Sequence, residues 1–253
     1  MSIRHWFAVL RAGRVLGCAA AMAVAGFAAE GKAAVQDIRI AAEGQATEIA
    51  GQVKGYAGAD YRVQGRAGQT LSVRMTVLAN RGLSFNLAPE GAAEAMVIGD
   101  HSGLDAKVML PADGAYVIST FLPRSAARRH ESGRFRLAVA IAGEALAPLS
   151  ASQDALVAGT RYHATARLSC RWAYAPAATT CDAGVVRRGH DATATVDIRG
   201  SDGRRRRLLF VKGQVVASDS AWPVSTRRNG DHTTVEIDGQ ERHEVPDALL
   251  TGG

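Results

Sequence analysis

Apolar and polar residues alternate along much of this chain, and this period of two constrains the fold more than any other feature. In one stretch the apolar residues occupy every second position: Leu71, Val73, Met75 and Val77. A later stretch repeats the pattern: Phe135, Leu137, Val139 and Ile141. Turn signals such as Asp113-Gly114 punctuate the region from Asp37 to Ala142, and no segment in it shows sustained helical spacing. The pattern predicts a β-sandwich or jelly roll.

Residues 159–253 show the same kind of alternation. Strands are expected at Ala192–Ile198, Arg205–Val211 and Thr233–Ile237, with turns at Ser201-Asp202-Gly203 and Asn229-Gly230-Asp231. The expected fold class is therefore all-β, with two β-sandwich or barrel-like domains after an N-terminal signal peptide.

The expected domain division is 1–28 for the signal peptide, 37–143 for the first β-sandwich, 144–158 for a linker and 159–253 for a small β domain. The linker is rich in small residues and has weak periodicity.

The N-terminus has the features of an export signal. Three arginines precede an apolar run, Val15–Phe27, which is too short to span a bilayer, and Gly26-Phe27-Ala28 suits cleavage. A lipoprotein signal ending at Cys18 is the alternative, but two of the arginines interrupt the apolar run that it requires. We expect a periplasmic or secreted protein with no membrane span after cleavage.

The net charge of the exported chain argues against a general nucleic-acid-binding protein. The chain has 30 basic and 24 acidic residues, and residues 1–28 hold three arginines and no acid. Cleavage leaves 27 basic and 24 acidic residues, a net charge of +3. Basic character in the exported protein is therefore local.

Two cysteines, Cys170 and Cys181, remain after cleavage. An even pair in an exported chain predicts a disulfide bond. A redox-active pair or a metal site is the alternative, but the spacing is wide and no further ligand pair completes a metal site.

The segment Pro123–Arg129 is the best candidate for a binding site. It holds three arginines and no acid between two expected strands, Gly114–Phe121 and Gly133–Ile141. A loop that displays forked guanidinium groups is suited to gripping carboxylates or phosphates. The alternative is a solvated basic turn.

Several segments of the first domain resemble the pre-peptidase C-terminal β-sandwich modules of exported bacterial proteins: Asp60-Tyr61, Ala67–Leu71, Leu110–Tyr116 and Gly133–Leu137. Two further motifs, Lys54-Gly55-Tyr56 and the Arg-x-x-x-Arg spacing of Arg124 and Arg128, resemble those of periplasmic inhibitors of goose-type lysozyme. The resemblance covers roughly residues 37–142.

The lysozyme-inhibitor resemblance implies that Tyr56, Arg124 and Arg128 contact the enzyme. The arginines would pair with acidic groups in the lysozyme cleft, and Tyr56 would add rigid contact area. The expected partner is then a goose-type lysozyme. The alternative is a structural or envelope-binding module that recognises peptidoglycan or another anionic polymer.

The second domain resembles an uncharacterised domain of exported bacterial proteins. The resemblance lies in Gly159–Thr165, the two cysteines, Gly184–Arg188 and the ending Glu241–Gly253. It departs from that pattern at Ala183, where an aromatic residue is usual, and at His243, where a tyrosine is usual. It implies a location and a fold but no activity.

No motif predicts an enzyme, a metal or a cofactor. Ser102, in Gly99–Gly103, lacks the strand-to-helix turn of a nucleophile, and a surface turn is expected there. His130, Glu131 and His163 lack the spacing of metal ligands. A hydrolase would need a carboxylate pair or a Ser–His pair that converges in a pocket.

Two features of the second domain leave alternatives open. The run Arg204–Arg207 is suited either to binding anionic polymers or to protecting an edge strand from pairing with another chain. Trp172 and Tyr174 would form an exposed aromatic platform or would cap the end of the β structure. Glu241 and Glu244 are expected to be solvated.

Overall fold

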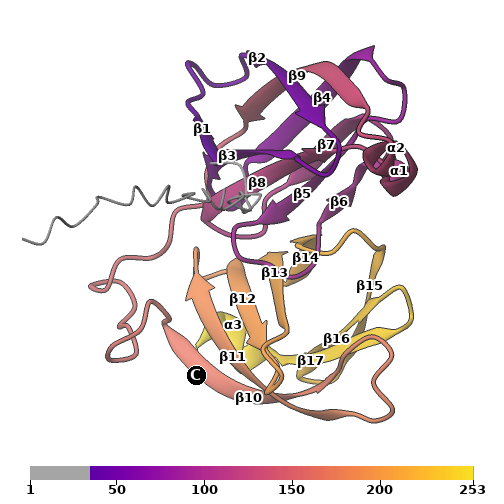
Figure 1. Ribbon diagram of the computed structural model, residues 1–253. Helices are drawn as coiled ribbons and strands as arrows, with labels where there is room; N and C mark the ends of the chain where they lie inside the picture. Colours follow the sequence, from indigo (N-terminus) through magenta and orange to yellow (C-terminus); the bar gives the residue numbers. More distant parts are fainter. Residues whose placement is uncertain (1–34, 253) are drawn as a thin grey trace, which may run out of the picture. The chain divides into compact units, whose positions relative to one another are not determined.

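The computed structural model describes residues 35–252 (Figure 1). The expected signal peptide lies outside them. Within this range no helix is long and apolar enough to cross a membrane. About half of the chain is strand and very little is helix, so the expected all-β class is confirmed.

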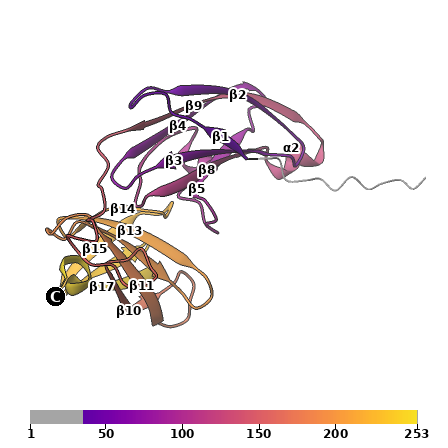
Figure 2. The ribbon, with the colours of Figure 1, turned by 90° about the vertical axis from the view of Figure 1, so that its left-hand side faces the viewer.

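Residues 36–142 form two sheets. One has five strands in the order β1 (Gln36–Ile38), β3 (Ala59–Gly65), β8 (Gly114–Phe121), β5 (Ser84–Pro89) and β6 (Val97–Ile98). The other has four, in the order β2 (Thr47–Lys54), β9 (Ser132–Ala142), β4 (Thr70–Ala79) and β7 (Asp105–Met109). Figure 2 shows β2, β9 and β4 in one layer and β3, β8 and β5 in the other, as in a β-sandwich.

Alternation along β4 and β9 separates the core from solvent as the sequence predicts. Leu71 and Val73 are fully buried, whereas Arg74 is exposed. Phe135 and Leu137 of β9 are also fully buried, and they pair in register with β4. Because side chains of a strand alternate between its faces, a single apolar face of each sheet supplies the core between the layers.

The C-terminal part forms one eight-stranded antiparallel sheet that is nearly closed and barrel-like. Its strands, in spatial order, are β14 (Gln214–Ser218), β13 (Arg205–Val211), β12 (Ala194–Arg199), β11 (Thr179–Arg187), β10 (Ala164–Arg171), β17 (Glu241–Pro246), β16 (His232–Ile237) and β15 (Val224–Asn229).

The three expected strands of this region correspond to β12, β13 and β16, and the two expected turns lie where they are predicted. The sequence pattern does not predict the short helix α3 (Asp247–Thr251) that follows β17. Leu249 and Leu250 of α3 are buried in the apolar core of this sheet. The expected linker, 144–158, contains no strand.

Candidate functional site

Tyr56 lies at the tip of a tight turn between β2 and β3. The turn is closed by reciprocal backbone hydrogen bonds between Lys54 and Ala57, at 3.0 and 3.3 Å. Gly55 has a φ of +57°, a left-handed conformation that glycine adopts without steric cost. The Tyr56 side chain is 62% exposed, although a tyrosine usually buries much of its ring.

The segment that carries Arg124 and Arg128 is a one-turn helix, α2 (Arg124–Arg128), and not the irregular loop expected from the sequence. Its turn is closed by the Ala127 N–H, which donates to the Pro123 carbonyl at 2.9 Å. Ala126 and Ala127 are buried, so they hold α2 against the sandwich. Residues four apart share one face of a helix, and both arginines are exposed.

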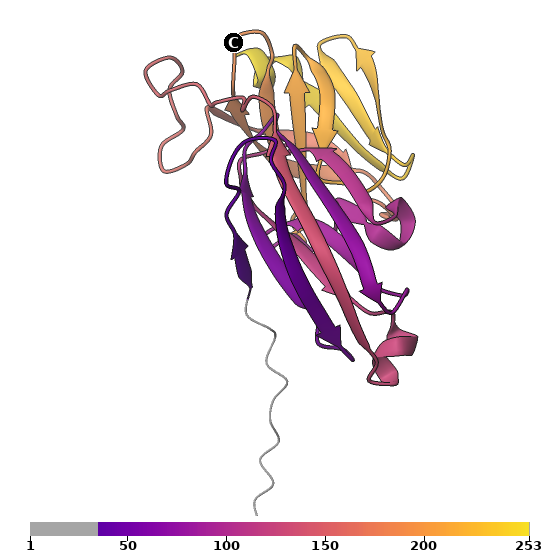
Figure 3. The same cartoon turned by 90° about the horizontal axis from the view of Figure 1, so that it is seen from above.

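The Tyr56 turn and the α2 segment are in direct contact. The Gly55 N–H donates to the Glu131 carbonyl at 2.8 Å. A Cβ atom at Gly55 would lie only 3.5 Å from His130 Nδ1 and 3.6 Å from the Ala127 carbonyl oxygen. Figure 3 shows α2 at the end of the sandwich strands, beside the end of β2. The structure therefore brings the turn of Tyr56 next to the helix of Arg124 and Arg128.

The three arginines of this segment differ in their partners. Arg129 forms an ion pair with Glu131 at 2.6 Å, and Asn80 also donates to Glu131 at 2.7 Å. The hydrogen bonds from Arg129 and Asn80 hold the pKa of Glu131 below its ordinary value. Within residues 35–252, neither Arg124 nor Arg128 forms an ion pair. Arg129 thus helps to fix the segment, and the other two guanidinium groups are available to a partner.

The arginine run at 204–207 does not form the surface that the sequence interpretation considered. β13 is not an edge strand, because it pairs with β12 on one side and β14 on the other. Protection of an edge is therefore the wrong explanation. Arg204 pairs with Asp202 and Arg205 with Asp197, so two of these charges are neutralised locally. The run offers no row of free charges to an anionic polymer.

Arg206 is almost fully buried at the centre of an ionic network. Its guanidinium donates two hydrogen bonds to Glu241, at 2.7 and 2.9 Å, one to Asp219 at 3.2 Å and one to Glu94 at 2.8 Å. Glu241 also contacts His243 Nε2 at 2.7 Å. The expectation that Glu241 is solvated is therefore wrong. The alternation of β13 could have predicted the burial of Arg206, because it places Arg206 on the same face as Leu208 and Phe210.

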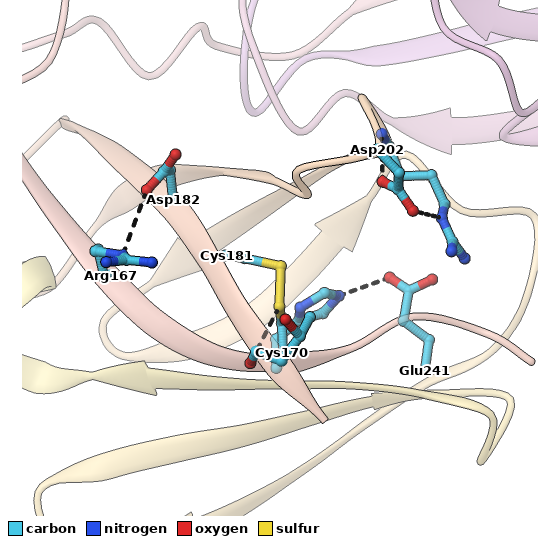
Figure 4. The surroundings of a disulfide bond; sticks show 9 residues. Arg167, Cys170, Cys181, Asp182, Asp202 and Glu241 are labelled. Atoms are coloured by element: carbon cyan, nitrogen blue, oxygen red, sulfur yellow. Dashed lines mark hydrogen bonds and ion pairs between the residues drawn. A yellow bond between two sulfur atoms is a disulfide. The ribbon is translucent and has the colours of Figure 1, made fainter. Parts of the chain in front are cut away.

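The disulfide bond between Cys170 and Cys181 is present, as predicted (Figure 4). It joins β10 to β11, which pair as an antiparallel hairpin. The two aromatic residues between the cysteines differ in exposure. Trp172 is buried and meets His243 edge to face, with ring centroids 5.1 Å apart, whereas Tyr174 is 89% exposed. The two residues therefore do not form a shared aromatic platform.

Replacing both cysteines by serine is expected to lower the free energy of unfolding by about 2–3 kcal/mol, because the crosslink restricts a short loop of the unfolded chain. Urea unfolding of the oxidised protein and of the double variant would measure this. Because β10 and β11 are also held together by their strand pairing, the variant is expected to retain the native circular dichroism spectrum. An equal unfolding free energy for both proteins would contradict the prediction.

The remaining candidate residues do not converge on a site. Ser102 lies in the one-turn helix α1 (Gly99–Ser102), where it is exposed. His163 is buried and contacts the Leu149 carbonyl through Nε2 and the Arg187 N–H through Nδ1. In the described part of the chain, no group of three or more His, Cys, Asp or Glu side chains is placed to hold a metal ion.

Comparison with known proteins gives similar solved structures only; no protein-family model and no curated protein matches the chain. PliG from Aeromonas hydrophila, a periplasmic lysozyme inhibitor of g-type lysozyme, is 31% identical and has a TM-score of 0.39. The match covers 42% of this chain and 95% of that protein.

PliG from Salmonella Typhimurium, also an inhibitor of g-type lysozyme, is 23% identical with a TM-score of 0.34, over 42% of this chain and 96% of that one. The pre-peptidase C-terminal domain of a Bacillus anthracis collagenase is 15% identical with a TM-score of 0.33, over 42% and 94%. Over about two fifths of its length, this chain is similar to periplasmic inhibitors of g-type lysozyme and to a pre-peptidase C-terminal domain.

Proposed function

We propose that this protein is an exported, non-catalytic binding protein that inhibits a g-type lysozyme in the periplasm or outside the cell. The observation that carries the proposal is the pairing of an exposed tyrosine turn with a helix that displays two arginines without ion partners in the described part of the chain. In this proposal Tyr56, Arg124 and Arg128 contact the enzyme.

The chemistry of this surface suits a partner whose cleft carries carboxyl groups, as a lysozyme does. Glycoside hydrolases cut their substrate with carboxyl groups that flank the scissile bond, so the cleft offers acidic partners. Guanidinium groups form strong, charge-assisted hydrogen bonds with carboxylates. A tyrosine adds a large, rigid contact area, and tyrosine and arginine are enriched among the residues that dominate binding energies. Binding across the cleft would block substrate without any reaction by the inhibitor.

The direct test is the turnover of peptidoglycan by a purified g-type lysozyme in the presence of this protein. We expect inhibition that saturates at an equimolar complex, with binding confirmed by calorimetry. A lysozyme of another structural type serves as the control for nonspecific effects of a basic protein. Full lysozyme activity at micromolar inhibitor would refute the proposal.

Replacing Tyr56 by alanine is expected to weaken inhibition by about 30-fold, the loss of about 2 kcal/mol that marks a dominant contact residue. Tyr174 supplies a matched control, because it is also an exposed tyrosine but lies in the Cys170–Cys181 hairpin. Inhibition constants of the two alanine variants would be compared. Equal inhibition constants for the two variants would show that Tyr56 does not belong to the binding site.

Gly55→Ala tests whether the turn geometry matters. Alanine at a φ of +57° costs about 1–2 kcal/mol. A change in the backbone that relieves this strain would move the Tyr56 turn relative to α2. We expect a loss of stability in urea and weaker inhibition. Gly44→Ala is the control, since Gly44 has a φ of +72° and a Cβ atom there would meet open space, with nothing within 4 Å. It should lose similar stability and keep full inhibition; a loss of inhibition in both variants would contradict the prediction.

A further inference from the structure

A pocket of about 330 Å³ lies beside the hairpin of β12 and β13. Five arginines line it: Arg199, Arg204, Arg205, Arg206 and Arg207. The segment Glu90–Glu94 and the residue Asp219 complete the lining and contribute three carboxylates. The lining therefore carries an excess of positive charge.

The three carboxylates of the pocket already have partners. Glu90 forms an ion pair with Arg62 at 2.9 Å. Glu94 and Asp219 both pair with Arg206, at 2.8 and 3.2 Å. Each of the three carboxylates is therefore paired with a cation, which weakens its repulsion of an incoming anion.

Arg207 is the arginine of this run whose side chain has no partner among the described residues. Its Nε is fully buried and makes no hydrogen bond, and among residues 35–252 its guanidinium forms no ion pair. Burial and the neighbouring charge of Arg205 lower the pKa of Arg207. Arg207 is partly buried, so its guanidinium has lost part of its hydration, and it gains no hydrogen bond from the described residues in return.

The acids closest to Arg207 in the fold are used elsewhere. Asp219 accepts a hydrogen bond at 2.9 Å from the backbone N–H of Arg207, not from its side chain. Asp197 lies opposite Arg207 in the register of β12 and β13, but its carboxylate is held by Arg205, Arg161 and Tyr162. The guanidinium of Arg207 thus lines the pocket and is partly buried, and no carboxylate of the described residues contacts it directly, although Asp219 and Asp197 attract it at longer range.

We propose that this pocket binds a small soluble oxyanion, a phosphate or a carboxylate, through the guanidinium of Arg207. Arg199 would close over the anion from the rim. Its side chain is 56% exposed, and its own contacts are long, 3.8 Å to Asp197 and 3.4 Å to the Tyr162 hydroxyl. The pocket volume of about 330 Å³ lies at the lower end of the range for small-molecule sites and is enough for an anion of this size. The proposal is independent of lysozyme inhibition.

Calorimetric titration of the full exported protein in chloride buffer, with inorganic phosphate in one arm and succinate in the other, tests the proposal. Saturable binding of either anion supports it and identifies the oxyanion; binding of neither overturns it. At roughly tenfold excess over the dissociation constant, the bound anion should raise the melting temperature by about 3–5 °C.

Arg207→Met keeps the length of the side chain and removes its charge, so it should lose both the binding heat and the anion-dependent shift. Arg167→Met is the matched control, because Arg167 is an exposed arginine of β10 outside the pocket. An Arg207→Met protein that binds the anion as the wild type does would overturn the proposal. If this variant does not fold, Arg199→Met at the exposed rim takes its place, with at least a roughly tenfold loss of affinity expected and an unchanged affinity contradicting the site.

Discussion

Replacing Arg124 and Arg128 together by alanine is expected to raise the inhibition constant for g-type lysozyme by at least about 100-fold. A hydrogen bond to a charged group contributes about 1.5–3 kcal/mol, and two such groups would be lost. Stability should change little, since both side chains are exposed and form no ion pair in the described structure. Steady-state inhibition and urea unfolding of the same variant would separate the two effects.

Arg39 and Arg66 provide the matched control for charge. Both are exposed arginines of the same sandwich, and they lie near the end of β3 opposite the Tyr56 turn, so their alanine variant removes the same net charge away from α2. It should inhibit as the wild type does. Inhibition by the wild type should also weaken as salt is raised, because exposed ion pairs are screened. If the Arg124 and Arg128 variant inhibits fully, the proposed mechanism is wrong even where inhibition itself is real.

Replacing Glu241 by alanine is expected to lower the free energy of unfolding by about 3 kcal/mol, because it removes the bidentate partner of the buried Arg206 and leaves one hydrogen bond each to Asp219 and Glu94. Urea unfolding would measure the loss. The exposed pair of Arg74 and Asp105 is the control, and Asp105→Ala should cost only about 0–1 kcal/mol. A cost below about 1 kcal/mol for Glu241→Ala would show that Asp219 and Glu94, which also pair with Arg206, are enough to compensate its charge.

The same network predicts how stability depends on pH. Burial raises the pKa of Glu241, but Arg206 and His243 lower it by a larger amount, from an ordinary value of 4.5 to about 2. Since the folded pKa lies below the unfolded one, this stabilisation is complete above pH 4.5 and is lost as the pH falls toward 2. Glu241→Gln should therefore show a shallower loss of stability over that interval. Parallel acid-dependent curves for the two proteins would contradict this assignment.

Local alternation predicted the strands well because burial of one face repeats every second residue. β12, β13 and β16 lie within two residues of their expected bounds. The same reasoning could not find α2, since a helix of five residues is too short to show a period. Proline before it and two alanines within it are consistent with its geometry but do not specify it.

The sequence alone could not predict which residues contact each other across the fold. Alternation alone places Arg206 on the inner face of β13, but Glu241 is 35 positions away and Asp219 lies beyond a further strand. A run of four arginines therefore looked like one surface feature, although its members point to different faces. The same limit applies to Tyr56 and α2, whose contact depends on how β2 and β9 pair at their ends.

The two buried alanines beneath α2 separate recognition from folding at this end of the sandwich. Ala126 and Ala127 pack against the sandwich, and the outward residues Arg124, Ser125 and Arg128 do not contribute to the core. Changes at the outward positions can therefore accumulate without loss of the scaffold. A lineage of such proteins would be able to follow changes in a target enzyme by substitution on one helical turn, and a protein engineer would be able to redirect it in the same way.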